Sequence, residues 1–299
     1  MYKSFEEIEQ SILSETTGRK RLVLAGAADH EALSAVVTAR RRGLIDAILL
    51  GNAAEIRAIL AELGEREEDY RIEETASEEE SANRAMQMVH GGEADIPMKG
   101  LMQTASFMRA VLNKEYGLVP EGALLSQTTV LEWPEKEKLL FISDCAINIA
   151  PDCAAKEKIL RNAVELAHRL GVEMPRVAVI SAVEVVREKI PSTLDAQKLA
   201  GMDWNDCIVG GPFALDNAVS EAAAEHKGIR HPAAGKADIL IMPDLCTGNV
   251  FTKSLTFFAH LRSAGAVCGP NVPLVMTSRA DTPENKYFSI LTAVMQCRR

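Results

Sequence analysis

The chain has few aromatic residues and no long apolar run. Phe, Tyr and Trp make up 5% of its 299 residues, so the core has to be built from aliphatic side chains and Met. This composition favours buried parallel strands and packed helices over an all-β sandwich. No apolar run approaches the ~18 residues of a membrane span, and the polar, acidic N-terminal segment lacks the apolar stretch of a signal peptide. We therefore expect a cytoplasmic protein with no membrane partner.

Several metal and cofactor motifs are also missing. The six Cys residues form no CxxC pair, and the six His residues form no HExxH motif, so we expect free thiols in a reducing compartment and no metal. The segment AGAADH at 25–30 resembles a dinucleotide loop but lacks GxGxxG, and no Walker A motif is present. These absences argue against a metalloenzyme, a Rossmann-type cofactor and a P-loop enzyme.

The net charge is −9 and the sequence pI is near 5.3. An acidic surface repels nucleic acid and anionic membranes, so neither is an expected partner. An anionic substrate would need a local cationic pocket that opposes the overall charge.

What the chain does contain is an alternation of short apolar runs and amphipathic stretches, typical of βαβ units and parallel sheets. The charged stretch 65–85 is interpreted as a solvated connection that leads into a helix. Ser192 is the expected N-cap of the helix that starts there. We predict strands at 21–27, 46–52, 94–100, 138–144, 176–182, 207–213, 237–244 and 272–278, with helices over 30–43, 53–64, 102–117, 154–171, 192–202 and 253–265. The pattern restarts after residue 130 and predicts two α/β domains with a cleft between them.

Ligands of open α/β sheets bind beyond the carboxyl ends of the strands. In this chain those ends carry small, hydroxyl, amide and cationic residues, which together predict an anion site. They are Lys99, Gly100, Ser143, Asp144, Cys145, Gly210, Gly211, Asp216, Asn217, Asp244, Thr247, Gly248, Asn249, Lys253, Thr277, Ser278, Arg279 and Asp281.

The segment TGNVFTK at 247–253 resembles a phosphate cradle. Gly248 would allow close backbone approach, the next helix would present N–H groups, and Lys253 would add charge. A glycine turn that caps a helix explains the same pattern. In TSRAD at 277–281, Arg279 offers a planar fork for two phosphate oxygens, although a surface Arg paired with Asp281 is the competing interpretation.

Cys145 follows a predicted strand, where a nucleophile could stand. The favoured interpretation is a small buried side chain, because free Cys is commonly buried and inert.

The ordered segments ADIPMKGLMQTASFMRAVLNKEYGL, LLFISDCAINIAPD, GGPFALDNAVSEAAAEHKGI, PDLCTGNVFTKSL and TSRADTPENKYFS resemble the phosphate acetyl/butyryltransferase family, and the butyryltransferase type most closely. The resemblance runs from about residue 20 to the C-terminus. It implies an isocitrate/isopropylmalate-dehydrogenase-like fold, with residues 1–131 plus 269–299 in one α/β domain and 132–268 in the other. It also implies an active site in the cleft and a homodimer or higher homo-oligomer.

The reaction implied by the resemblance is acyl-CoA plus phosphate giving acyl phosphate plus coenzyme A, by direct transfer in a ternary complex. No metal or prosthetic group takes part. Ser278 and Arg279 match the residues that handle the phosphoryl group. The substrate-binding matches are Thr247, Gly248, Asn249, Lys253, Lys99 and Gly100; Asp144, Cys145 and Asp216 are expected near coenzyme A. The general base stays open among Asp281, Asp216 and Asp144, since Glu284 and Asn285 occupy the region where acetyltransferase relatives carry an aspartate.

Two other classes of function remain. A dehydrogenase of the same broad fold is one, because fold does not fix function. A non-catalytic protein that binds acyl-CoA or phosphate is the other. Within the transferase interpretation, acetyl-CoA is the alternative to butyryl-CoA, since one methylene changes binding by only ~1–3 kcal/mol.

Overall fold

The computed structural model describes residues 1–14 and 18–297 and divides into two compact units. Unit 1 consists of Met1–Ser4 and Leu124–Ser263, and unit 2 of Phe5–Ala123 and Ala264–Arg299. The domain boundaries expected from the sequence lie at 131/132 and 268/269. Those boundaries remain a prediction.

Unit 2 is built on a four-stranded parallel sheet with the strand order β3-β2-β1-β4. Its strands are β1 (Lys20–Ala25), β2 (Ile45–Gly51), β3 (Arg71–Glu74) and β4 (Ile96–Lys99). The last four residues of β1 and all four of β4 are buried, as expected for strands covered by helices on both faces.

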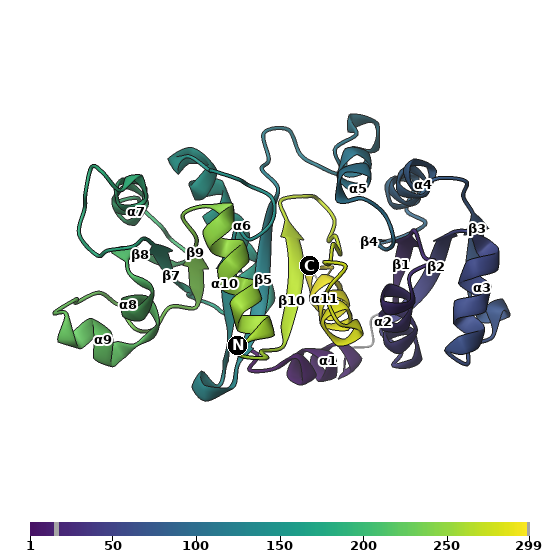
Figure 1. Ribbon diagram of the computed structural model, residues 1–299, viewed down its shortest axis with the longest axis horizontal. Helices are drawn as coiled ribbons and strands as arrows, with labels where there is room; N and C mark the ends of the chain where they lie inside the picture. The colour runs from purple at the N-terminus through teal and green to yellow at the C-terminus, as the bar shows by residue number, and fades with distance from the viewer. Residues whose placement is uncertain (15–17, 298–299) are drawn as a thin grey trace. The chain divides into compact units, whose positions relative to one another are not determined.

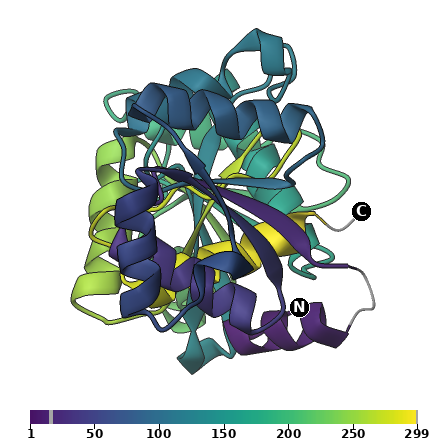
Figure 2. The same ribbon diagram turned by 90° about the vertical axis from the view of Figure 1, so that its right-hand side faces the viewer.

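Several helices of unit 2 begin at side-chain caps. Asp29, Asn52 and Ser77 each accept a backbone N–H from the first turn of the helix that follows. The helices are α1 (Phe5–Ser14), α2 (His30–Arg41), α3 (Ala53–Glu62), α4 (Glu78–His90), α5 (Thr104–Val111) and α11 (Pro283–Gln296), with short 3₁₀ turns at Glu67–Asp69 and Lys114–Tyr116. Figure 2 shows α4 over one face of the sheet and α2 over the other.

The sheet of unit 1 contains the strand order β5-β6-β9-β7-β8. The strands are β5 (Ser126–Trp133), β6 (Lys138–Ser143), β7 (Arg176–Ile180), β8 (Ile208–Phe213) and β9 (Ile239–Ile241). The helices are α6 (Cys153–Arg169), α7 (Pro191–Ala200), α8 (Leu215–Val219), α9 (Glu221–His226) and α10 (Leu245–Phe257), and a 3₁₀ turn covers Pro134–Lys136. In this order β5 and β6 are antiparallel, and the pairs β6–β9, β9–β7 and β7–β8 are parallel (Figure 1). The chain leaves the unit through β10 (Ser263–Cys268).

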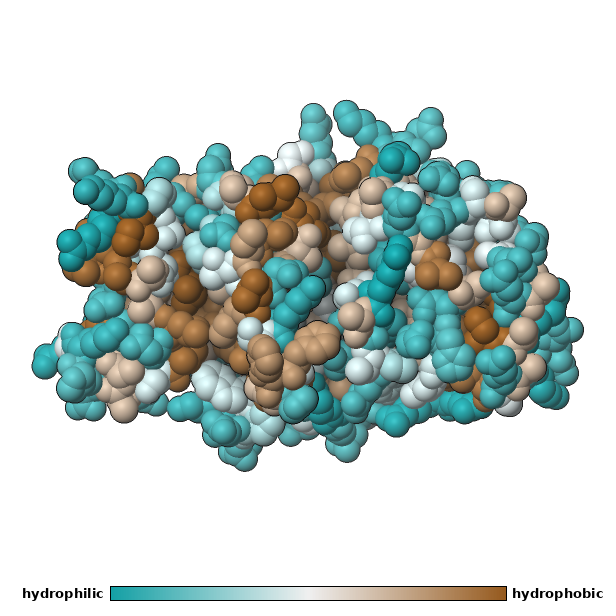
Figure 3. All heavy atoms as spheres, viewed as in Figure 1, coloured by the Kyte–Doolittle hydropathy of each residue, from teal (hydrophilic) through white to brown (hydrophobic). Residues whose placement is uncertain are grey.

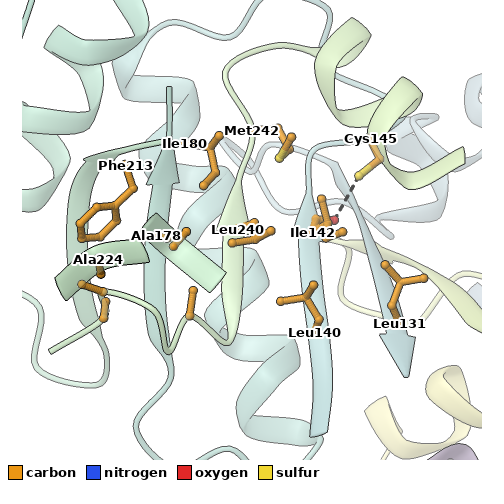
Figure 4. Packing of buried hydrophobic residues seen from close by; sticks show 14 residues of the cluster. Leu131, Leu140, Ile142, Cys145, Ala178, Ile180, Phe213, Ala224, Leu240 and Met242 are labelled. Carbon is orange, nitrogen blue, oxygen red and sulfur yellow. Dashed lines mark hydrogen bonds between the residues drawn. The ribbon is translucent and has the colours of Figure 1, made fainter. Parts of the chain in front are cut away.

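The core of unit 1 is aliphatic, as its low aromatic content requires. Leu140, Ile142, Leu240 and Ala178 line neighbouring strands and point to the same side, where Phe213 closes the cluster (Figure 4).

Several predicted elements are wrong. The helix expected over 253–265 is instead α10, which starts at Leu245, and His260 has a positive φ of 52°, a conformation that no helix continues. The expected strand 272–278 is reduced to isolated bridges at Leu274 and Val275. Ser192 is not an N-cap, because the helix starts at Pro191, which has no N–H to satisfy.

Three strands were missed: β3, β5 and β10, the last of which begins within the helix predicted over 253–265. β3 lies in the stretch interpreted as a solvated connection, where its charged residues suit a sheet edge. β5 pairs antiparallel with β6, an arrangement that the βαβ pattern does not predict.

Candidate functional site

In unit 2, the segment before TSRAD lies beside β4. Met98 and Val275 form a parallel bridge. The Lys99 N–H donates to the Val275 carbonyl at 2.9 Å, and the Val275 N–H donates to the Pro97 carbonyl at 3.0 Å. Because parallel neighbours end at the same edge, Lys99 and the Ser278 turn meet at the carboxyl edge of the sheet.

The side chain of Lys99 is buried, with 4% of its surface exposed. Its Nζ donates to the Gly100 carbonyl at 3.2 Å and the Met102 carbonyl at 3.3 Å. Burial lowers the pKa of Lys99, and repulsion from Arg279 lowers it further. This edge therefore holds a buried cation whose hydrogen-bond partners, in the part of the chain that the structure describes, are carbonyls.

Gly100 is needed for packing. A Cβ there would lie 2.2 Å from the carbonyl oxygen of Gly26, at the end of β1. The two turns pack backbone to backbone, joined by hydrogen bonds from the Gly100 N–H to the Ala25 carbonyl and from the Leu101 N–H to the Gly26 carbonyl, both 2.8 Å.

The turn at 278–281 is closed by its own hydrogen bonds. The Ser278 N–H donates to Asp281 Oδ2 at 2.7 Å, and the Asp281 N–H donates to the Ser278 carbonyl at 3.2 Å. Arg279 is exposed and makes no hydrogen bond or ion pair within the described chain. The competing interpretation, an Arg279–Asp281 ion pair, is therefore wrong, and the guanidinium is available to a ligand.

Lys286 of α11 contacts the same turn and was missed in the sequence analysis. Only 2% of it is exposed, and its Nζ donates to the Ser278 carbonyl at 2.7 Å and the Asp281 carbonyl at 3.1 Å. The available signal was its place in KYFSILTAVM, an otherwise uncharged segment of α11 that is buried throughout.

In unit 1, Asp144 organises the loop after β6. Its carboxylate accepts the N–H groups of Ala146 at 2.8 Å, Ile147 at 3.0 Å and Asn148 at 3.3 Å, together with the Asn148 side-chain amide. Asp144 is buried, so these donors define a structural role for its carboxylate.

Cys145 is a buried side chain in the core cluster. Its thiol donates to the Ile142 carbonyl at 3.2 Å (Figure 4). Burial raises the pKa of the Cys145 thiol to about 12, so the thiol is neutral near pH 7. A neutral, buried thiol is a poor nucleophile.

The TGNVFTK segment was predicted to precede a helix. It lies instead within α10. Asp244 is the N-cap and accepts the Thr247 N–H at 2.8 Å. A Cβ at Gly248 would lie 2.3 Å from the Asp144 carbonyl oxygen. The Asn249 side chain donates to the Cys145 carbonyl at 3.1 Å. Gly248 and Asn249 thus hold α10 against the loop after β6, while Lys253 is exposed.

Asp216 lies apart from these residues, after β8 at the far end of the strand order of unit 1. Its carboxylate is exposed and pairs with Lys227 Nζ at 3.0 Å. That hydrogen bond lowers the pKa of Asp216.

The predicted residues thus form two groups. Unit 2 brings together Lys99, Gly100, Ser278, Arg279 and Asp281, and unit 1 brings together Asp144, Cys145, Gly248 and Asn249. That both groups serve one cleft stays a prediction.

No three His, Cys, Asp or Glu side chains gather as a possible metal site in residues 1–14 and 18–297. Over the same residues, no helix is long and apolar enough to cross a membrane.

Known proteins resemble the chain in sequence and in structure. The family model described as phosphate acetyl/butaryl transferase matches residues 69–294. The chain is 43% identical over 299 residues to phosphate butyryltransferase of Clostridium acetobutylicum, which covers 99% of this chain and 98% of that protein. It is 41% identical over 280 residues to phosphate acetyltransferase of Thermotoga maritima, with 92% and 95% covered. The crystal structure of a branched-chain phosphotransacylase from Enterococcus faecalis V583 has a TM-score of 0.85 and 32% identity, with 94% of this chain and 99% of that chain covered.

The expected fold class is confirmed. The two sheets are of parallel type, and the likeness to phosphotransacylases supports the dehydrogenase-like α/β fold.

Proposed function

The chain belongs to the phosphate acetyl/butaryl transferase family, and we propose that it transfers a short acyl group between coenzyme A and inorganic phosphate. The observation that carries this proposal is the cationic edge of unit 2. There Arg279 has no partner within the described chain and stands in the field of the buried Lys99. The resemblance found in the sequence is confirmed by the family match.

A phosphate oxygen attacks the thioester carbonyl, so the new C–O bond replaces the C–S bond. The proton of the phosphate goes to the departing thiolate of coenzyme A. Arg279 and Ser278 are proposed to bind the phosphate, since a guanidinium fork and a hydroxyl suit its oxygens. The buried Lys99 is proposed to add positive charge to this site. Gly100 is proposed to allow the close turn after β4.

Asp281 is the proposed acid–base residue. Its carboxylate is fixed by the Ser278 N–H, in the same turn as Arg279. In the reverse direction it would take the proton of the coenzyme thiol, whose pKa resembles the ~8.5 of a free Cys. The Asp144 carboxylate is occupied by backbone donors, and Asp216 pairs with Lys227, so neither fits this role as well.

Transfer is proposed to be direct, without an acyl-enzyme on Cys145. The raised pKa of its buried thiol supports this mechanism. No metal or prosthetic group is proposed. In unit 1, Thr247, Asn249 and Lys253 on α10, with the loop at Asp144 and Cys145, are proposed to face the coenzyme. Butyryl-CoA or a similar short chain is the proposed acyl donor, and acetyl-CoA is the alternative.

Self-association is proposed through the apolar residues at the end of α10. Phe257 is 60% exposed, and Phe258, which follows the helix, is 85% exposed. Apolar side chains reach the surface over this helix (Figure 3). A second copy of the chain would cover this apolar group and remove it from solvent. The cytoplasm is the proposed location of the protein.

The reaction is tested by mixing the purified protein with phosphate and acyl-CoAs from acetyl to hexanoyl, with and without EDTA, and following thiol release. Release that depends on phosphate and ignores EDTA supports the proposal, and its maximum identifies the acyl chain. Absence of release from folded protein would leave the binding-protein alternative.

A variant assigns the phosphate site. Arg279→Ala is expected to lower kcat/KM for phosphate about 100-fold, which corresponds to ~2.7 kcal/mol. Arg66→Ala is the matched control, because Arg66 is an exposed Arg that pairs with Asp69 on the surface. Equal activity of both variants would contradict the assignment.

A further inference from the structure

We propose that Lys286 is a positioning residue of the phosphate site: its buried ammonium holds the Ser278–Asp281 turn and, with Lys99, favours a doubly charged oxyanion. This inference rests on the proposed function and adds a residue outside TSRAD.

The first argument is geometric. The Lys286 Nζ donates to the Ser278 and Asp281 carbonyls, at the two ends of the turn. Both carbonyls are therefore directed toward α11. The same two residues also bond to each other and so close the turn. The Asp281 N–H donates to the Ser278 carbonyl, and the Ser278 N–H donates to the Asp281 carboxylate. The Ala280 N–H donates to the Ser278 hydroxyl at 3.3 Å. One ammonium thus fixes the turn from which Arg279 projects.

The second argument is the placement of Lys286 on its helix. α11 begins after Thr282, whose hydroxyl caps the Asn285 N–H at 3.1 Å. Lys286 is the fourth residue of the helix and the first of a run that is buried through Met295. Its ammonium therefore reaches the turn from the interior, and its hydrogen-bond partners within residues 1–14 and 18–297 are the two turn carbonyls.

The third argument is charge. Neither Lys99 nor Lys286 forms an ion pair within the described chain. Arg279 and Lys286 both repel the charge of Lys99, and Asp29 and Glu78 offset this repulsion in part. Buried charges are costly without a counter-charge. An anion with two negative charges, such as phosphate near neutral pH, would supply this counter-charge.

The test compares Lys286→Met with wild type in the full chain. The Met variant keeps an unbranched side chain, one atom shorter, and removes the charge and the donors. Phosphate KM is expected to rise at least about tenfold, or ~1.4 kcal/mol, while the KM for acyl-CoA stays within about twofold. A shift confined to phosphate is not what a general loss of stability produces.

A second readout needs no turnover. Inorganic phosphate is expected to raise the Tm of wild type, and this shift should be lost in Lys286→Met. If wild type releases no thiol, the proposed function fails, and the Tm shift still decides the inference. If wild type turns over and both phosphate KM and the Tm shift survive in the variant, the inference is overturned and the function stands.

Two further variants separate phosphate binding from folding. Lys286→Gln keeps an N–H donor without the charge, and carries the same test where the Met variant does not fold. Lys156→Met is the matched control: Lys156 is 4% exposed and pairs with Asp195 at 2.7 Å in unit 1. Its loss should lower stability and leave phosphate KM unchanged. Equal effects of Lys156→Met and Lys286→Met on phosphate KM would overturn the inference.

Discussion

Gly248 touches Asp144 along the backbone: a Cβ on Gly248 would lie 2.3 Å from the Asp144 carbonyl oxygen and 3.3 Å from the Cα of Cys145. The atoms it would meet belong to the main chain, so no side chain can move aside. The contact therefore fixes how closely α10 approaches the loop after β6.

Gly248→Ala is expected to destabilise the chain by about 1–3 kcal/mol, because α10 must shift away from that loop. Urea unfolding measures the change. Gly18→Ala is the control, since nothing lies within 4 Å of a Cβ at Gly18. An equal, small effect at both glycines would contradict the close packing.

Cys145→Ser is expected to keep turnover within about threefold of wild type, because the thiol is not the proposed nucleophile. With a pKa of about 12, roughly 10⁻⁴ of the Cys145 thiol is ionised at pH 8. Alkylation by iodoacetamide should therefore be slow and should accelerate as the pH approaches 12. Exposed Cys246 gives the reference rate by mass spectrometry. Loss of turnover that parallels Cys145 labelling at pH 8 would argue for a covalent role.

Asp281→Asn is expected to lower kcat at least about tenfold and to remove the base-dependent limb of the pH–rate profile for acyl phosphate plus coenzyme A. Asp216→Asn should keep that limb, because the Asp216 carboxylate is engaged by Lys227, and this hydrogen bond lowers its pKa. Stopped assays across pH 5–9 distinguish them. The opposite result would move the base to Asp216.

Sequence reasoning is most informative where structure is local. TSRAD predicts a short turn that displays its side chains, and Ser278 and Arg279 are exposed in the structure, while their roles stay predictions. Sequence reasoning failed where the answer depends on packing. Lys286 looks like an ordinary helix residue until α11 is buried on all sides, and Gly248 looks like an anion-binding glycine until Asp244 caps the helix three residues before Thr247.

Lys99→Met is expected to stabilise the chain near neutral pH while weakening phosphate binding. Burial and neighbouring cations lower the pKa of Lys99 from its ordinary value of 10.5. The unfolded chain therefore binds the proton more tightly than the folded chain does. The resulting loss of stability is complete below the folded pKa and disappears as the pH rises toward 10.5.

The advantage of Lys99→Met should accordingly shrink between neutral pH and pH 10.5, as measured by urea unfolding at several pH values. Saturating phosphate should reduce the advantage at neutral pH, because the anion stabilises charged Lys99 only in wild type. A constant difference at all pH values, insensitive to phosphate, would mean that the change in side-chain packing, and not the buried charge, sets the stability of this edge.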